Sequence, residues 1–329
     1  MQTRTLGRTG RSVSVIGLGT WQLGADWGEV DEADALAVLD AAYGAGVTFF
    51  DTADVYGDGR SESLIGSWLK ANAGSGVTVA TKMGRRVDQI PENYVLDNFR
   101  EWNDRSRRNL GVDALDLVQL HCPPTPVYSS HEVFDALDTL VAEGRIRNYG
   151  VSVETVEEAL TAIRRPGVAS VQIILNAFRL KPLDEVLPAA ATAGVGIIAR
   201  VPLASGLLSG RYDLDTTFAA DDHRTYNRHG EAFDVGETFS GVDYATGVRA
   251  AQDFSELVRG SLPDVTPAQA ALAWVASLPE VSTVIPGARN PDQARANAVA
   301  GSIELPAGFD DAVHRLYDTH LREAIHSRW

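Results

Sequence analysis

Four polar residues of this sequence have side chains that could act together on a carbonyl group: Asp51, Tyr56, Lys82 and His121. A buried lysine is costly unless it is paired, and an aspartate can supply the pairing. A tyrosine, with a pKa near ~10, is a poor acid at neutral pH, but an adjacent ammonium stabilises the phenolate and lowers that pKa. A neutral histidine can donate a hydrogen bond to an oxygen held beside the tyrosine. These groups suit a carbonyl that becomes an alkoxide, which is the demand made by hydride delivery.

Three of these residues occupy equivalent places in consecutive predicted strands. Asp51 ends one strand and leads into the segment DTADVYG (51–57), Lys82 ends the next strand, and His121 ends the one after. Successive members are separated by about one βα unit, and chemistry in an α/β barrel is expected at the carboxyl ends of the strands. The three side chains should therefore project toward one mouth, with Tyr56 in the loop just beyond Asp51.

The elements that must position them alternate between short β-rich runs and amphipathic helical patterns. Strands are predicted at 15–18, 48–51, 77–82, 115–121, 146–151, 171–175, 197–200 and 282–286. Helices are predicted at 31–45, 61–71, 91–110, 131–143, 154–164, 183–193, 267–277 and 291–300. Eight βα units predict a single-domain (β/α)8 TIM barrel over residues 1–329, opened by a short β-hairpin that turns at 7–10. The rival architecture, a doubly wound sheet, should begin with a GxGxxG fingerprint, which this sequence lacks.

Composition and charge narrow the possible functions. The formal net charge of the 329 residues is −15, which argues against a grip on nucleic acid or on an anionic membrane surface. The chain has one cysteine, Cys122, and no basic segment followed by an apolar stretch at its start, which favours a cytoplasmic location. The segment from Leu203 to about Gly247 reads as an insertion, and its length favours a functional role.

Five motifs resemble those of the aldo-keto reductases, in the correct order. They are DTADVYG at 51–57, Thr81-Lys82, LVQLHCPP at 117–124, GRIRNYGVS at 144–152 and PLASGLLSG at 202–210. The resemblance extends from Leu6 to Asn297. It implies a catalytic tetrad of Asp51, Tyr56, Lys82 and His121, with NADPH lying extended across the barrel mouth. The implied reaction is the reduction of a small aldehyde or ketone to an alcohol, with Tyr56 as the proton donor.

The same resemblance implies the cofactor contacts. Ser152, Gln172 and Asn176 would hold the nicotinamide carboxamide. Many relatives carry an Asn where this chain has Val153, so one hydrogen bond to the carboxamide is either lost or supplied by Asn176. The pyrophosphate would run along 203–210, and the adenosine phosphate would lie at 286–297; the expected contacts are Pro202, Leu203, Ser205, Gly206, Leu208, Gly287, Arg289, Gln293 and Asn297. Trp21 is grouped with these contacts as a pocket residue, the alternative being a place in the core.

Arg200 stands where many relatives stack a tyrosine on the nicotinamide ring. A guanidinium plane can stack on a flat ring, but beside oxidised, cationic nicotinamide it is electrostatically unfavourable. The sequence therefore predicts a preference for the reduced cofactor. At 289–291, Asn290 can cap a helix that begins with Pro291, and Arg289 has a planar fork suited to a phosphate, which predicts NADPH over NADH.

Other interpretations remain. A regulatory subunit could keep the fold and the cofactor but turn over slowly, although the intact tetrad argues against it. A metal-dependent hydrolase lacks clustered ligands at strand ends, and the spacing of His223 and His229 does not place them on one helical face, so we expect no metal. Arg85 and Arg86 are expected at the surface, with contact to an anionic substrate as the alternative.

Overall fold

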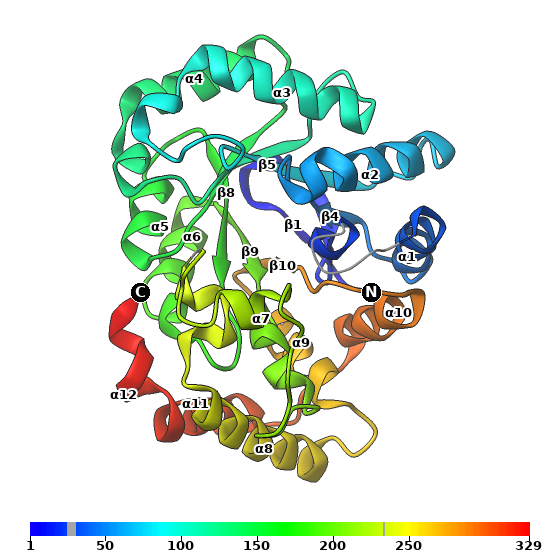
Figure 1. Cartoon of the computed structure of the whole chain (residues 1–329), viewed down its shortest axis with the longest axis vertical. Helices are drawn as coiled ribbons and strands as arrows, with labels where there is room; N and C mark the ends of the chain where they lie inside the picture. Colours follow the sequence, from blue (N-terminus) through cyan, green and yellow to red (C-terminus); the bar gives the residue numbers. More distant parts are fainter. Residues whose placement is uncertain (25–30, 233) are drawn as a thin grey trace.

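The computed structural model describes residues 1–24, 31–232 and 234–329, and a parallel sheet of eight strands lies at its centre (Figure 1). The strands are β3 (Leu18–Gly19), β4 (Phe49–Asp51), β5 (Thr78–Met83), β6 (Leu117–His121), β7 (Tyr149–Ser152), β8 (Val168–Ile174), β9 (Gly196–Arg200) and β10 (Val281–Val284). Each strand pairs with the next along the chain. The first and last meet where Gly17 N donates to Val284 O at 2.7 Å and Gly19 N to Pro286 O at 3.0 Å. The predicted (β/α)8 barrel is confirmed.

Helices surround the barrel (Figure 1). The longer ones are α1 (Glu32–Gly44), α2 (Arg60–Ala71), α3 (Leu96–Leu110), α4 (His131–Ala142), α5 (Val156–Ile163), α6 (Val186–Ala193), α8 (Tyr244–Ser261), α9 (Pro267–Ser277), α10 (Pro291–Val299) and α11 (Phe309–His320). Two differences from the sequence prediction stand out. Helix α3 begins at Leu96 because Pro91–Asn93 form a separate 3-10 turn. Helices α8 and α11 were not predicted, although Asp243 caps α8 by accepting a hydrogen bond from Thr246 N.

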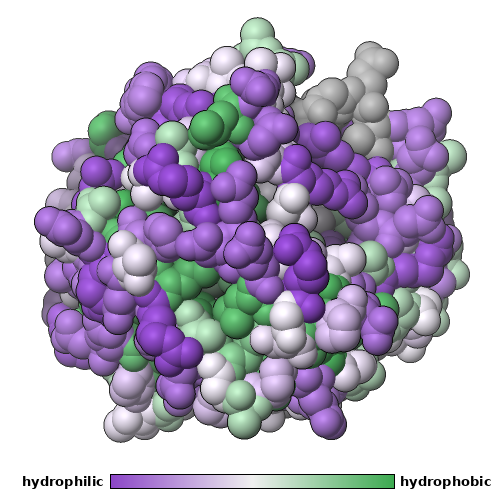
Figure 2. All heavy atoms as spheres, turned by 90° about the horizontal axis from the view of Figure 1, so that it is seen from below, coloured by the Kyte–Doolittle hydropathy of each residue, from purple (hydrophilic) through white to green (hydrophobic). Residues whose placement is uncertain are grey.

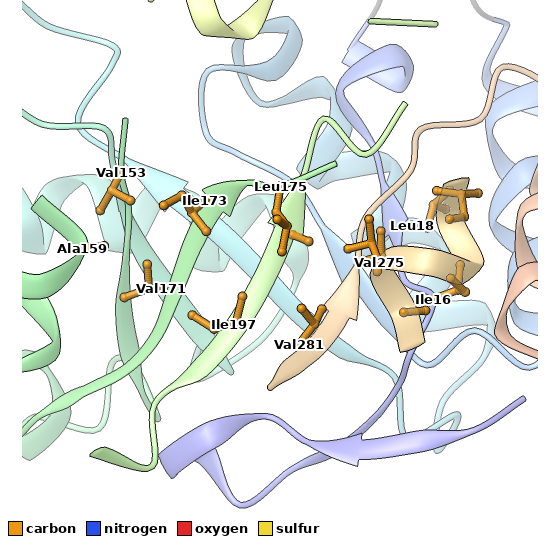
Figure 3. Close-up of a cluster of buried hydrophobic side chains, with 14 of the residues drawn as sticks. Ile16, Leu18, Val153, Ala159, Val171, Ile173, Leu175, Ile197, Val275 and Val281 are labelled. Atoms are coloured by element: carbon orange, nitrogen blue, oxygen red, sulfur yellow. The ribbon is translucent and has the colours of Figure 1, made fainter. Parts of the chain in front are cut away.

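Alternation along the strands separates two hydrophobic layers. Outward side chains such as Val171 and Ile173 of β8 and Ile197 of β9 pack under the helices (Figure 3). The inward residues next to them form a separate cluster inside the barrel, made of Leu6, Val13, Phe49, Ala80, Leu117, Ile198 and Ile285. The next inward residues of β4, β5 and β9, two positions further along each strand, are polar. They are Asp51 after Phe49, Lys82 after Ala80 and Arg200 after Ile198. The barrel is therefore apolar at its base and polar at its mouth.

The predicted N-terminal hairpin closes the base of the barrel. Its strands are β1 (Thr3–Thr5) and β2 (Ser12–Ser14), which pair antiparallel. Leu6 and Val13 are fully buried in the interior cluster, so the hairpin supplies the apolar floor. Arg8 fastens the turn by donating from Nη1 to the carbonyl oxygens of Pro166 and Val168, each at 2.8 Å.

One face of the molecule is largely hydrophilic (Figure 2). On the face shown in Figure 2, hydrophilic residues predominate and hydrophobic ones are seen mainly in recesses between them. Among the described residues, no helix is long and apolar enough to cross a bilayer.

Replacing Gly7 with alanine should disrupt the floor of the barrel. Gly7 has a φ of +45°, and a Cβ there would lie 2.1 Å from Gly196 N and 2.4 Å from Ala169 O. Gly10→Ala is the matched control, since Gly10 has a φ of +65° with nothing within 4 Å of an added Cβ. In urea unfolding, Gly10→Ala should cost about 1–2 kcal/mol for the left-handed backbone, and Gly7→Ala about 1–3 kcal/mol more for the backbone clash. Equal losses would show that the hairpin does not pack against β9 in this way.

Candidate active site

The strand ends bring the four predicted catalytic residues together at the barrel mouth. Asp51 and His121 are the last residues of β4 and β6, and Lys82 lies one residue before the end of β5. Tyr56 opens the short 3-10 turn Tyr56–Gly59 that follows β4. Its ring centroid lies 5.9 Å from that of His121, nearly perpendicular to it.

A buried ion pair lies under this mouth. Lys82 and Asp51 are 1% and 2% exposed, and Lys82 Nζ donates to Asp51 Oδ1 at 2.5 Å. Lys82 Nζ also donates to the carbonyl oxygen of Thr52 at 2.9 Å and to Tyr56 Oη at 3.4 Å. All three donors of the ammonium therefore have acceptors, which offsets the cost of burying its charge. The third acceptor is the phenol itself.

Two glutamines complete the surroundings of Asp51. Its second oxygen, Oδ2, accepts from Gln172 Nε2 at 2.8 Å and from Gln119 Nε2 at 3.3 Å. Gln119 stands opposite Lys82 in the register between β5 and β6. Both oxygens of the carboxylate therefore have partners, and the side chain of Gln172 supports Asp51 in addition to lining the cavity.

Burial shifts the pKa values of Tyr56 and Lys82 in opposite directions, and a neighbouring charge acts against burial at each residue. Burial raises the pKa of the Tyr56 phenol, the Lys82 ammonium lowers it, and the net direction is upward. Burial lowers the pKa of Lys82, but the Asp51 carboxylate and Tyr56 together more than offset this, and the net direction is also upward. The net lowering of the Tyr56 pKa expected from the sequence is thus wrong, because desolvation outweighs the ammonium. Tyr56 is a protonated phenol whose anion would have a cation beside it.

His121 is neutral. Burial lowers its pKa well below the usual range, and nearby cations, Arg85 foremost, act in the same direction. Its Nδ1 is buried and has no hydrogen-bond partner among the described residues. An unpartnered N–H costs more than an unpartnered ring nitrogen without a proton, so we assign the proton to Nε2. The histidine can therefore donate a hydrogen bond without carrying a charge.

A cavity of about 1140 Å³ opens above these groups. Asp51, Tyr56 and His121 line it, while Lys82 lies behind them. Trp21 forms part of its wall, with its ring 6.0 Å from that of Tyr56 and 5.6 Å from that of His223. This volume lies at the upper end of small-molecule sites, so it could accommodate a large cofactor together with a small substrate.

Most of the predicted cofactor contacts line this cavity, but three do not. The lining ones are Trp21, Ser152, Gln172, Arg200, Pro202, Leu203, Ser205, Gly206, Gly287, Arg289 and Gln293. Asn176 lies outside, because its amide donates to Val201 O at 2.9 Å and to Ser240 Oγ at 3.0 Å. It therefore does not replace the Asn that Val153 displaces. Leu208 is a buried core residue, and Asn297 donates to Gly287 O at 3.0 Å, so it shapes the loop from behind.

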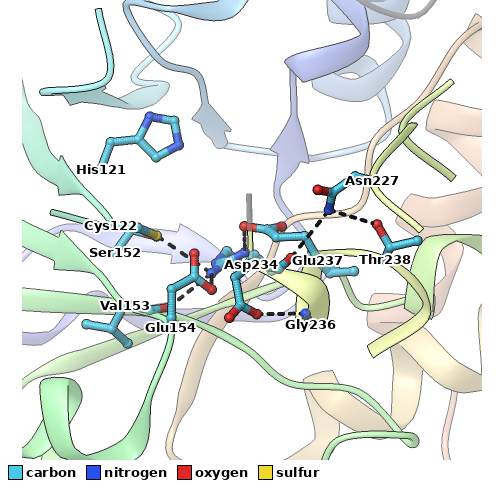
Figure 4. Close-up of polar contacts among 12 residues, drawn as sticks. His121, Cys122, Ser152, Val153, Glu154, Asn227, Asp234, Gly236, Glu237 and Thr238 are labelled. Atoms are coloured by element: carbon cyan, nitrogen blue, oxygen red, sulfur yellow. Dashed lines mark hydrogen bonds and ion pairs between the residues drawn. The ribbon is translucent and has the colours of Figure 1, made fainter. Parts of the chain in front are cut away.

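The charge of Arg200 is already compensated. Its guanidinium donates to Glu154 Oε2 at 3.0 Å and forms a short ion pair with Glu237. Figure 4 shows the two glutamates reaching toward this region from different loops. Because two carboxylates neutralise the guanidinium, the predicted preference for the reduced cofactor loses its electrostatic basis. Arg200 lines the cavity as part of an ion cluster.

The backbone around the cavity fits a bound dinucleotide. Val201, Ala204 and Ser205 have positive φ values of 52°, 48° and 56°, and for a β-branched residue such as Val201 this is a genuine outlier. Backbone strain of this kind clusters at functional sites. On the other side of the cavity, Asn290 caps α10 as predicted, accepting from Gln293 N at 2.9 Å. This helix start leaves Arg289 exposed at the cavity edge, where a phosphate would find a cation and a positive helix end.

Sequence reasoning missed several cavity residues. Glu154 and Glu237 partner Arg200, and His223, considered only as a metal ligand, lies against Trp21. Arg85, expected at the surface, lines the cavity. The available signals were the position of Glu154 directly after a strand end and the aromatic and charged content of the insertion. Within the described part of the chain, no group of three His, Cys, Asp or Glu side chains is placed to hold a metal ion.

Comparison with known proteins agrees with this geometry. The family model described as "Aldo/keto reductase family" matches residues 15–318. An uncharacterised oxidoreductase of Mycobacterium tuberculosis is 34% identical over 310 residues, covering 92% of this chain and 88% of that protein. A probable voltage-gated potassium channel subunit beta of Oryza sativa is 32% identical over 314 residues, covering 89% of each. An aldo-keto reductase of Klebsiella pneumoniae solved in complex with NADPH has a TM-score of 0.72 and 26% identity, covering 96% of each chain. The chain belongs to the aldo/keto reductase family.

Proposed function

We propose that this protein reduces an aldehyde or ketone to an alcohol with NADPH as the cofactor, and that residues 1–329 form one catalytic unit. The observation that carries the proposal is the contact of one buried ammonium, Lys82, with both Asp51 and Tyr56 at the base of a large cavity. Because Tyr56 contacts this ammonium and also lines the cavity, it can pass its proton to a bound molecule, and the cation beside it would stabilise the phenolate that remains.

The chain's own residues handle the proton and the oxygen. NADPH, when bound, would supply the hydride that the carbonyl carbon accepts. Tyr56 gives its phenolic proton to the carbonyl oxygen, and the positive charge of Lys82 stabilises the phenolate that remains. His121, neutral and protonated on Nε2, donates a hydrogen bond to the same oxygen as negative charge develops on it. The reaction consumes one carbonyl, one NADPH and one proton, and yields the alcohol and NADP⁺.

Residues at three parts of the cavity would hold the cofactor. Ser152 and the free oxygen of Gln172 lie where a carboxamide could be bound, and the strained segment 201–206 follows the expected path of the pyrophosphate. Gly287, Arg289 and Gln293 would face the adenosine end. The solved Klebsiella relative, which contains NADPH, supports this choice of cofactor.

A panel of carbonyl compounds tests the activity. Aliphatic, aromatic and dicarbonyl substrates are offered with NADPH, and the loss of NADPH absorbance is followed together with alcohol formation. We expect stoichiometric oxidation of NADPH with at least one class. The second candidate, a regulatory subunit, is favoured by the similarity to the potassium channel subunit of rice. Tight NADPH binding in a fluorescence titration, without turnover of any carbonyl, would support that candidate and contradict catalysis.

Tyr56→Phe keeps the ring and removes the proton donor. We predict that kcat falls by about 10²-fold or more while NADPH affinity, measured by fluorescence titration, changes little. Tyr43→Phe is the matched control, since Tyr43 is an exposed residue of α1 remote from the cavity. Near-normal turnover in Tyr56→Phe would rule out Tyr56 as the acid.

Arg289→Ala removes the cation proposed to contact the adenosine phosphate. Because a charge-assisted contact would be lost, we predict that NADPH affinity falls by about 10- to 100-fold while NADH affinity is nearly unaffected. Arg295→Ala serves as the control, because Arg295 lies in α10, the helix that follows Arg289, has a side chain that is 56% exposed and pairs with Asp292. Equal losses for both cofactors, or no loss for either, would remove Arg289 from the phosphate site.

A further inference from the structure

Arg85 occupies a defined place in the wall of the cavity. It follows Lys82 by three residues, just beyond the end of β5, and its side chain is 21% exposed. Nε donates to the carbonyl oxygen of His121 at 3.2 Å, which fixes the guanidinium beside the histidine. The part of Arg85 that remains accessible therefore borders the same space as the reacting groups.

Most of the hydrogen-bonding capacity of this guanidinium is unused. Nη2 approaches Glu154 Oε1 only at 3.5 Å, a long contact, while the other oxygen of Glu154 is held by Arg200 at 3.0 Å. Nη1 has no hydrogen bond to any described residue. Arg200 is thus the main partner of Glu154, and it also forms an ion pair with Glu237. Arg85 therefore faces the cavity with N–H groups that are available to a bound molecule.

Two other charged residues near Arg85, Asp234 and Arg86, have partners of their own. Asp234 also lines the cavity, but its Oδ1 accepts from Gly236 N at 2.6 Å and from Trp329 Nε1 at 3.2 Å. Arg86, the next residue after Arg85, points to Asp58, with 2.9 Å between Nη2 and Oδ1. Aromatic rings, those of Trp21, Tyr56 and His223, form another wall. Arg211, Arg224 and Arg289 also line the cavity, but Arg85 is the arginine bonded to the backbone of His121. Next to the reacting groups the cavity therefore offers aromatic surface and the planar cationic fork of Arg85, which can bind a carboxylate bidentately.

We propose that the natural carbonyl substrate carries a carboxylate, and that Arg85 binds this group while the carbonyl oxygen lies between Tyr56 and His121. This inference rests on the proposed function and narrows it to anionic aldehydes or ketones. Arg85 is then a specificity-determining residue in direct contact with the substrate.

Carboxybenzaldehyde and nitrobenzaldehyde provide a matched pair, because the two substituents are nearly isosteric and only one is charged. The kcat/KM of each is measured with NADPH in the ortho, meta and para series, and the ratio of carboxy to nitro is compared between wild type and Arg85→Met. Using this ratio cancels the electronic difference between the substituents. It also cancels any displacement of His121, since that would slow both aldehydes alike.

For the ring position that fits best, Arg85→Met should lower the ratio about 10- to 100-fold. Arg85→Lys, which keeps the charge but loses the fork, should give an intermediate ratio, and Arg86→Met should leave it unchanged. If the wild type reduces both aldehydes and the ratio is the same in Arg85→Met, the carboxylate proposal is overturned while carbonyl reduction stands. If the wild type reduces none of these aldehydes but reduces another carbonyl of the panel, the carboxylate proposal alone is overturned. If it reduces no carbonyl at all, both proposals are overturned.

Discussion

The buried pair of Lys82 and Asp51 is the constraint around which the mouth of the barrel is organised. An ammonium and a carboxylate that are almost fully excluded from water are tolerated only when their remaining hydrogen-bonding capacity is used. The chain meets this requirement with the carbonyl of Thr52, the amides of Gln119 and Gln172, and the phenol of Tyr56. The phenol is therefore part of an electrostatic network whose other members come from strands β4, β5, β6 and β8 and from the loop after β4.

A second ion cluster couples the inserted segment to the barrel. Arg200 ends β9, Glu154 follows β7, and Glu237 comes from the segment between β9 and α8, so three separate parts of the chain converge on one guanidinium. Trp329 holds the same segment from outside, packing 4.0 Å from the guanidinium of Arg179 and donating to Asp234. The lining of the cavity opposite the tetrad therefore depends on contacts between residues distant in sequence. Arg85, which makes one long contact to Glu154, borders the cavity beside this cluster.

The fold, and the meeting of Asp51, Tyr56, Lys82 and His121 at one mouth, could be predicted because both follow from the order of strands and helices along the chain. Period-two alternation and strand-end positions placed Asp51, Lys82 and His121 on one mouth, and Asn290 before Pro291 located the start of α10. The predictions that failed concern contacts between residues distant in sequence. Nothing in the sequence indicates that Asn176 binds Ser240 or that two glutamates neutralise Arg200. Nor does it indicate that burial raises the Tyr56 pKa by more than Lys82 lowers it. Helix α8 was missed because it begins inside a segment that was treated as an insertion.

The central claim is that Lys82 controls the acidity of Tyr56, and an NMR titration tests it directly. The protein is labelled at the tyrosine ring carbon that bears the hydroxyl, Tyr56→Phe assigns the signal, and circular dichroism confirms that each variant is folded. Removing the ammonium leaves burial and the Asp51 charge, both of which raise the Tyr56 pKa. The Tyr56 pKa should therefore be higher in Lys82→Met than in the wild type, with Lys82→Met/Asp51→Asn less elevated than Lys82→Met alone. An unchanged or lower Tyr56 pKa in Lys82→Met would contradict the account.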